Sequence, residues 1–495
     1  MPKTVRQPKK SASRIHYGDP LRLPSRVIEA LGYDAAASSK RRRMPSSLLR
    51  HEDQVLDPTQ RRKLLATSRD LGRNFAVARW MVNKHLDWVA NFTFQSRTGI
   101  PELDDRIEQL VDWWSRPHNF DAAGRHGLFR ALRLAEGSRV RDGDAFFVLL
   151  NDGTVQTVEG DRVCEPSGGL PSDYREGSWS HGVLLNASGG AQAYMICRRG
   201  KYSQFEFDRI VPAPYAIHHA WWDRFDQTRG ISPLAPAINL LRDAYEGATY
   251  ALAQMKVAQL FGLATFREAE TGLGTVTGSG DQEDEEPFKV DFDKGPFHLD
   301  LDVNDKAQFL QSQNPSQQFQ DFWKAVLMAA MKSLNLPWSF YDEASTNFFG
   351  SRAALNLYVV AAEVQRADVR ATADALVRWR SKLWILDGEL NIERYGLSIP
   401  ELRFDWQPRG VRWWNPVQEI SGAKAAIRAG LDTRTRILRE ISGADFRETV
   451  DQIAEENDYI REKLGEGWVD PEGKAELLRP ASRTESSDAT AEAAS

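Results

Sequence analysis

Two adjacent histidines are the side chains of this sequence with the plainest potential for chemistry. His218 and His219 precede Asp223 and Asp226, and imidazoles beside carboxylates can hold a metal ion or move protons. These residues flank a pair of tryptophans where a strand is expected to give way to a loop. Histidines in such surroundings are most often satisfied by hydrogen bonds inside the fold. We therefore interpret the pair as structural.

A phosphate-binding loop is the second kind of chemistry that the residue types could suggest. Such a loop ends in Gly-Lys-Ser or Gly-Lys-Thr. The Gly-Lys pairs at Gly200 and Gly473 are followed by Tyr202 and Ala475, and the glycines between residues 272 and 280 do not separate a strand from a helix. We therefore expect no cofactor, no metal site and no enzyme activity.

Composition is that of an ordinary globular chain of 495 residues, with 41% hydrophobic and 27% charged residues. It holds no apolar run of the roughly twenty residues that a membrane span needs, and its first residues lack the apolar segment of a signal peptide. We expect no membrane association, and we expect the chain to be made in the cytoplasm. The two cysteines, Cys164 and Cys197, cannot build a disulfide framework, and we interpret both as buried apolar residues.

Charge is unevenly distributed although the net charge is only −5. Residues 1–50 hold twelve Lys or Arg against three acids, a net +9, so residues 1–56 form a basic arm. Two interpretations fit the arm, a solvated tail or a segment that touches phosphates or a partner. Residues 266–310 hold twelve acids against four bases, a net −8. Such blocks concern partners and solubility, and they do not determine the fold.

The expected elements are mainly helical with small sheets, an α+β fold. Asp57 followed by Pro58 is typical of a helix start, and we expect a helix over residues 57–90. Asn151, Asp152 and Gly153 separate two apolar runs and predict a hairpin. Other expected elements are helices at 104–114, 120–136, 315–335, 352–384 and within 416–464, and strands at 194–211, in "FKVDF", in "FHLDLDV" and in "LRFDWQP".

A long helix is expected from Pro233 to Phe261, with Ser232 as its cap. Alanines recur along it every seven residues, beside bulkier leucines. A helix with such a stripe can pack closely on two sides, as in a bundle, a coiled coil or a ring of like helices, or it can be the central helix of a monomeric domain. The columns include Ala237, Ala244, Ala251, Ala258, Leu241 and Leu252.

Several stretches in order resemble the lambda-like portal family of tailed bacteriophages. They include "SRDLGRNFAVARWMVNKH", "HHAWWDRFDQTRGISPLAPAINLLRD", "DKGPFHLDLDVNDKAQFLQSQNPSQQFQDF", "TNFFGSRAAL" and "NPVQEISGAKAAIRAGLDTRTRILREISGADFRETVDQIAEE", and they span about residues 60–465. The sequence departs from the family's pattern at Asn415, where an aspartate is usual, and at Phe348 and Phe349, where small polar residues are usual.

The resemblance implies a ring, commonly a dodecamer, at one capsid vertex, through which double-stranded DNA is packaged and ejected. It divides the chain as follows: the basic arm at 1–56, a wing at 57–222, a first stem helix at 223–265, a small α/β clip at 266–312, a second stem helix at 313–340, a tunnel loop at 341–352, a long helix with the wing's return at 353–410, a helical crown at 411–465 and a disordered tail at 466–495.

The resemblance also implies roles for particular residues. The alanine and leucine columns would pack stem helices against each other. Residues facing DNA would be Ser345, Thr346, Asn347, Phe348, Phe349 and Arg352, although the two phenylalanines could instead fold back against the wing. The clip, with Asp281, Glu283, Asp284, Glu285 and Glu286, would dock the terminase large subunit and later the head-to-tail adaptor proteins. Major capsid and scaffold proteins are further implied partners, and the virion is the implied location.

Two other functions remain open from the residues alone, a cytosolic nucleic-acid-processing enzyme and a coiled-coil scaffold. The enzyme would need a cluster of carboxylates, which the spacing does not support. Three tryptophan pairs could stack on bases, but without a basic groove in the sequence we favour packing in the core or between subunits. These pairs are Trp113 with Trp114, Trp221 with Trp222 and Trp413 with Trp414.

Overall fold

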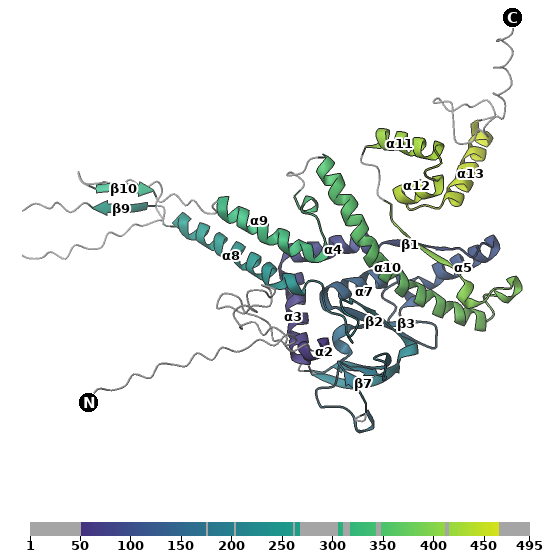
Figure 1. The fold of residues 1–495 in the computed structure, drawn as a ribbon, viewed down its shortest axis with the longest axis horizontal. Coiled ribbons are helices and arrows are strands. Elements are labelled where there is room, and N and C mark those ends of the chain that lie inside the picture. Colours follow the sequence, from purple (N-terminus) through teal and green to yellow (C-terminus); the bar gives the residue numbers. More distant parts are fainter. Residues whose placement is uncertain are drawn as a thin grey trace, which may run out of the picture. The chain divides into compact units, whose positions relative to one another are not determined.

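The computed structural model describes residues 51–174, 177–201, 204–260, 263–267, 305–309, 317–342, 348–410 and 415–464. The chain forms two units, one up to Val55, where α2 (Glu52–Val55) lies, and one from Leu56 onward. The second unit is α+β with helices predominating, as expected (Figure 1). Among the described residues, no helix combines the length and the hydropathy of a membrane span.

The helices at the start of the second unit confirm one predicted boundary and correct the predicted length of that helix. Asp57 accepts hydrogen bonds from the backbone of Thr59 and Gln60 at 2.8 and 2.9 Å, so α3 (Pro58–Asn74) begins where the sequence indicates. The single helix expected to residue 90 is interrupted at Phe75, whose backbone is extended, and continues as α4 (Ala76–Val89). Next come α5 (Pro101–Trp114), α6 (Pro117–Phe120) and α7 (Leu128–Asp142).

The helix expected over residues 120–136 begins later because the preceding loop is tightly held. Asp121 accepts from the backbone of Arg125 and His126. A Cβ at Gly127 would lie 2.3 Å from the carbonyl oxygen of Ser115, so only glycine fits this close approach. Gly127 is the N-cap, and α7 starts at Leu128.

Three small antiparallel sheets accompany these helices. The predicted hairpin is confirmed as β2 (Asp144–Leu149) and β3 (Val155–Glu159), and β8 (Ala216–Ala220) pairs with the other edge of β2. A second sheet has the order β4 (Trp179–Ser180), β5 (Val183–Leu185), β6 (Ala191–Arg199) and β7 (Phe205–Pro212). The third joins β1 (Phe92–Ser96) to β11 (Phe404–Pro408), with Phe94 opposite Trp406.

The main core forms around the long helix α10 (Phe348–Leu386). Val369, Leu376 and Trp384 on this helix are fully buried, and the Trp384 ring meets Trp114 of α5 edge-on at 6.2 Å. A second apolar cluster fills the space between the first two sheets around Phe146 and Ile196. These two clusters fix the sheets and the first helices relative to α10.

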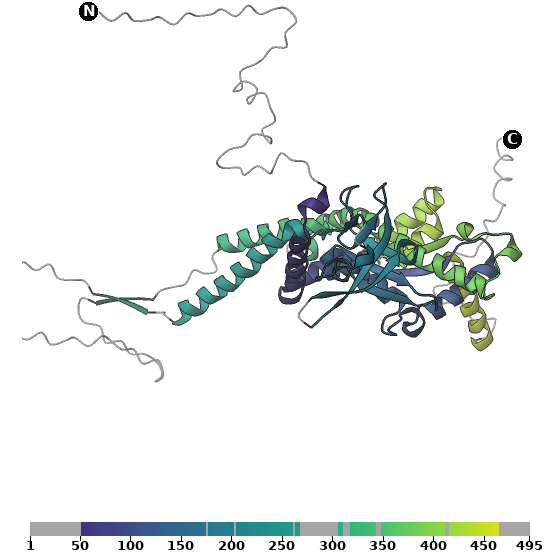
Figure 2. The same cartoon turned by 90° about the horizontal axis from the view of Figure 1, so that it is seen from below.

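Two helices form a hairpin before α10, α8 (Ile238–Leu260) and α9 (Gln317–Met331), which lie side by side in both views (Figures 1 and 2). The helix expected to begin at Pro233 begins at Ile238, because residues 235–237 form a 3-10 turn. The strand β9 (Leu263–Arg267) pairs antiparallel with β10 (Asp305–Phe309). The strands expected in "FKVDF" and "FHLDLDV" lie outside the described residues.

The C-terminal helical region is confirmed as α11 (Pro416–Arg428), α12 (Arg434–Ile441) and α13 (Phe446–Leu464), and residues 466–495 lie outside the described ranges. Asp445 fixes α13 in two ways. Its carboxylate accepts from the backbone of Arg447 at 2.8 Å and Glu448 at 3.4 Å, which caps the helix, and it forms an ion pair with Arg97 beside β1. One buried carboxylate thus joins the last helix to the first strand.

We expect Asp445→Ala to destabilise α13 by about 1–3 kcal/mol, because it removes a cap and a charge-assisted hydrogen bond. Asp445→Asn keeps a capping oxygen and loses only the charge, so its effect should be smaller. Hydrogen exchange of the α13 amides measures both. If alanine and asparagine accelerate exchange equally, the cap contributes nothing and the ion pair alone holds the helix.

Candidate functional site

A buried carboxylate, Asp144, holds the base of the α8–α9 hairpin to the sheets. Its oxygens accept from the guanidinium of Arg229 at 2.6 and 2.9 Å and from that of Arg61 at 3.2 Å. Burial would raise the pKa of Asp144, but Arg229 and Arg61 outweigh it and hold that pKa well below its ordinary value. Arg229 also donates to the carbonyls of Gly160 and His181, so the segment leading to α8 is tied to two separate loops.

A second buried carboxylate, Glu136 on α7, joins four elements. It accepts from His85 of α4 at 2.8 Å and from His219 of β8 at 2.9 Å, and it pairs with Arg139 at 3.1 Å. Burial opposes its charge, but Arg139 and the two histidines keep the pKa of Glu136 below its ordinary value. Arg139 also pairs with Asp368 of α10 at 2.8 Å.

The histidine pair is structural, as predicted. His218 lies 3.2 Å from Asp144 and stacks on Phe146, with ring centroids 4.2 Å apart, and burial lowers the pKa of its imidazole. His219 bonds Glu136 and, at 2.9 Å, the hydroxyl of Thr372. In the described part of the chain, no group of three metal-ligating side chains comes together.

The tryptophan pairs and the cysteines agree with the predictions only in part. Trp114 is fully buried and donates to the Gly153 carbonyl, and Trp221 packs under Arg139, whereas the partners of both, Trp113 and Trp222, are exposed. Trp413 and Trp414 lie outside the described residues. Cys197 is buried, but Cys164 is only half-buried because it lies at the rim of a small cavity.

The α8–α9 hairpin corrects the predicted helix-packing columns. Ala237, Leu241 and Ala244 are buried in the subunit's own core, and Trp323 of α9 donates to the carbonyl of Ala244 at 3.0 Å. They cannot meet a neighbouring subunit. Leu252 is exposed and Ala251 is half-buried, whereas the Ala258 side chain lies outside the described residues. Further exposed apolar side chains on the hairpin are Tyr250, Phe322 and Met328.

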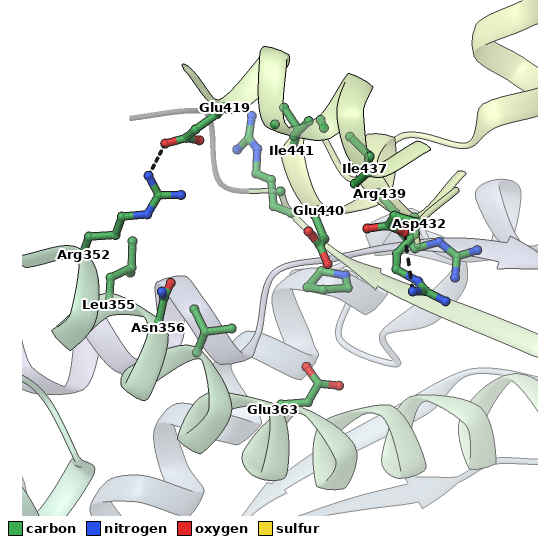
Figure 3. Close-up of a pocket in the computed structure, with 18 of the residues that line it drawn as sticks. Arg352, Leu355, Asn356, Glu363, Glu419, Asp432, Ile437, Arg439, Glu440 and Ile441 are labelled. Carbon is green, nitrogen blue, oxygen red and sulfur yellow. Dashed lines mark hydrogen bonds and ion pairs between the residues drawn. The ribbon is translucent and has the colours of Figure 1, made fainter. Parts of the chain in front are cut away.

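The predicted tunnel loop is partly helical. Phe348 and Phe349 belong to the first turn of α10, and Ser345, Thr346 and Asn347 lie outside the described residues. Arg352 was expected among the residues that face DNA. Instead it forms an ion pair with Glu419 of α11 at 2.8 Å (Figure 3), because the C-terminal helices lie opposite the first turns of α10. The clip residues Asp281, Glu283, Asp284, Glu285 and Glu286 also lie outside the described residues.

A cavity of about 930 Å³ separates α10 from α11 and α12 (Figure 3). Its walls are strongly charged. Glu363 faces it from α10 and pairs with Arg366 at 3.2 Å and with Arg370, while Asp432 pairs with Arg436 at 3.4 Å on the other side. Arg366 and Arg370 belong to α10 and Arg436 to α12, so the two walls come from segments far apart in the sequence.

We expect Asp144→Asn to lower the free energy of unfolding by about 3–5 kcal/mol, since Arg61 and Arg229 would stay buried without a full counter-charge. Asp112→Asn is the matched control, because Asp112 and its partner Arg116 are both exposed, and its expected cost is below about 1 kcal/mol. Denaturant unfolding at neutral pH measures both. If Asp144→Asn lowers the free energy of unfolding no more than Asp112→Asn does, Asp144 does not hold the two buried arginines as described.

The pH dependence follows from the depressed pKa of Asp144. A carboxyl whose folded pKa lies below its unfolded value stabilises the protein above the unfolded pKa, and this contribution disappears as the pH falls through the folded pKa. The difference between the wild type and Asp144→Asn should therefore narrow as the pH drops below about 4. A difference that stays constant down to acid unfolding would show that the carboxylate's charge is not what matters.

Residues 41–366, roughly two thirds of the chain, match the family model of the phage portal protein, lambda family. This chain belongs to that portal family. The predicted resemblance is thereby confirmed. The matched region contains α3 to α9, the strands from β1 to β10 and the first half of α10, and so it includes both buried carboxylates.

A relative from a phage agrees with this membership. A probable portal protein of Halomonas phage phiHAP-1 is 23% identical over 405 residues, which cover 74% of this chain and 72% of that protein. A chain in the neck of the native gene transfer agent particle, computed with C12 symmetry, is 16% identical over 78% of this portal-family chain and 94% of its own length, with a TM-score of 0.44. A chain in the virion of that particle is 15% identical, covering 78% and 99%, with a TM-score of 0.43.

Proposed function

We propose that this portal-family chain is the subunit of a homo-oligomeric ring, commonly a dodecamer in the family, at one capsid vertex of a tailed phage. Double-stranded DNA is packaged and ejected through the ring. The observation that carries the ring is the exposed apolar surface of the α8–α9 hairpin, where Phe322 is 66% and Tyr250 68% exposed. Exposed aromatic side chains on both helices of a hairpin suit burial between neighbouring subunits.

A second exposed stripe on α10 supports the same arrangement. Leu357, Val360 and Val364 are 75%, 69% and 64% exposed, and with Ala353 and Ala367 they recur at alternating spacings of four and three residues. This is the heptad spacing by which one helix packs along another. In a ring each subunit presents different faces to its two neighbours, so two separate apolar surfaces on one chain fit head-to-tail packing.

The remaining parts of the proposal rest on family membership and on the charge distribution. The acidic clip at residues 266–312 docks the terminase large subunit during packaging and head-to-tail adaptor proteins afterwards. Major capsid and scaffold proteins surround the ring, which is made in the bacterial cytoplasm and ends in the virion. The segment from Ser345 to the start of α10 faces the DNA. The portal itself is not an enzyme, and a separate ATPase supplies the energy of packaging.

We expect Phe322→Asp to prevent ring formation, because a carboxylate buried between two subunits would lack a partner. The subunit should stay folded, since this side chain makes little contact within its own chain. Leu386→Asp, at the end of α10 and 80% exposed, is the control and should still form rings. Native mass spectrometry measures both. Wild-type protein found only as monomers and dimers under all conditions would contradict the ring, and a coiled-coil scaffold would then be favoured.

The proposed role of the clip has a separate test. Deleting residues 271–286 removes its acidic stretch, and we expect ring assembly to persist while binding of the terminase large subunit and DNA packaging fall. A deletion of the C-terminal residues 480–495 is the control. Unchanged packaging after deletion of the acidic stretch would show that it does not take part in motor docking.

A further inference from the structure

Two adjoining hollows on the portal subunit form one arginine-lined groove. The first, of about 810 Å³, lies between α3, α4 and α7, and the second, of about 530 Å³, lies where α7 meets β2 and β3. They share Arg130, Leu134 and Arg141, so they are continuous. Nine arginines and three acids line the two hollows together. We call this surface the arginine groove.

The acids of the groove are already neutralised. Asp142 pairs with Arg69 at 2.7 Å, Asp87 pairs with Arg133 at 2.6 Å, and Glu159 pairs with Arg199. Most of the positive charge that remains comes from arginines whose guanidinium groups have no hydrogen bond or ion pair with any described residue. Four of them, from three different helices, are Arg73, Arg79, Arg130 and Arg141.

Two glycines within helices lie beside the Arg141 side chain of the groove. Gly72 and Gly137 both lie inside helices, where glycine costs about 1 kcal/mol relative to alanine. A Cβ at Gly137 would come within 3.3 Å of a guanidinium nitrogen of Arg141, and one at Gly72 within 3.6 Å of its Cδ. The approach at Gly72 is an ordinary contact, whereas a side chain at Gly137 would crowd the guanidinium group of Arg141.

We propose that the arginine groove binds the phosphodiester backbone of duplex DNA. Unpaired guanidinium groups present the forked donors that match phosphate oxygens. A docking site for an acidic protein would also need an apolar centre, usually with aromatic anchors, and the two phenylalanines among the described residues of the groove, Phe146 and Phe147, are buried in the sheets. Backbone contacts without base contacts give binding that does not depend on sequence.

This inference goes beyond the proposed function, because it adds a static DNA contact on the body of the subunit to the DNA that passes through the ring. The geometry suits static contact. The groove draws on helices α3, α4 and α7, and the last two are fixed to the core through Glu136 and Arg139. DNA held at such a site has no need to slide, so affinity there does not impede packaging.

The test measures binding of full-length protein to a short labelled duplex by fluorescence anisotropy over a range of salt concentrations. One variant replaces Arg73, Arg79, Arg130 and Arg141 with glutamine. The matched control replaces four arginines that are exposed and unpaired in the described structure but lie outside the groove, namely Arg403, Arg428, Arg434 and Arg447. Both variants lose the same charge and both keep the basic arm, so any binding by the arm is common to the two.

We expect the groove variant to bind the duplex about ten-fold or more weakly. We also expect its plot of log binding constant against log salt concentration to be less steep, by about 0.9 for each phosphate that the variant no longer neutralises. The control should keep the wild-type slope. An equal weakening in both variants, or no binding by the wild type, would overturn the inference. So would displacement of the duplex by a peptide of residues 281–286, which would identify an acidic protein segment as the ligand.

Native mass spectrometry of the groove variant completes the test. The oligomer should be unchanged, which would separate this inference from the proposed ring. If the groove variant no longer assembles while the control does, the groove is an interface between copies and the DNA proposal fails. A protein that forms rings but shows no groove-dependent binding would reject this inference and leave the proposed portal function standing.

Discussion

The rest of the structure depends on the ion pair between Asp144 and Arg229, because it fixes where the α8–α9 hairpin leaves the body of the subunit. A carboxylate with no solvent contact is costly unless its charge is matched, and the guanidinium groups of Arg229 and Arg61 match it. Arg61 brings α3 to the same point. One neutralised charge thus sets the relation between α3, the central strand β2 and the hairpin, which a hydrophobic contact would define less sharply.

The two halves of helix α10 have different surroundings, and contacts to Glu136 of α7 lie where the halves meet. The C-terminal half of α10 lies in the core around Leu376 and Trp384. Its N-terminal half carries the exposed stripe from Ala353 to Ala367 and faces the C-terminal helices across a cavity. Between them, Asp368 and Thr372 bind Arg139 and His219, both of which touch Glu136. A helix anchored at its middle can present an uncovered face without losing its position.

Local signals in the sequence predicted local structure well and long-range contacts poorly. The Asp57 cap and the turn at Gly153 depend on neighbouring residues, and both are confirmed. The helix start at Pro233 was wrong because the Ser232 hydroxyl donates to the carbonyl of Val140 far away in the sequence, which holds this segment in a turn. The ionic centre at Asp144 could not be predicted either. It joins residues from three separate segments, and none of them differs in type from an ordinary surface charge.

The arginine groove shows how charge that is dispersed in the sequence becomes concentrated in the fold. Between residues 69 and 141 the arginines are interleaved with acids, and the chain as a whole carries a net −5, so the sequence suggested no basic surface in this part of the chain. The fold pairs Asp142, Asp87 and Glu159 with one set of arginines and leaves another set facing outward. Each of these acids lies closest to its own partner arginine, so the pairs contribute little net charge to the groove. The local potential of the groove is therefore set by its unpaired arginines and not by the net charge of the chain, which is why a nearly neutral protein can carry a strongly basic site.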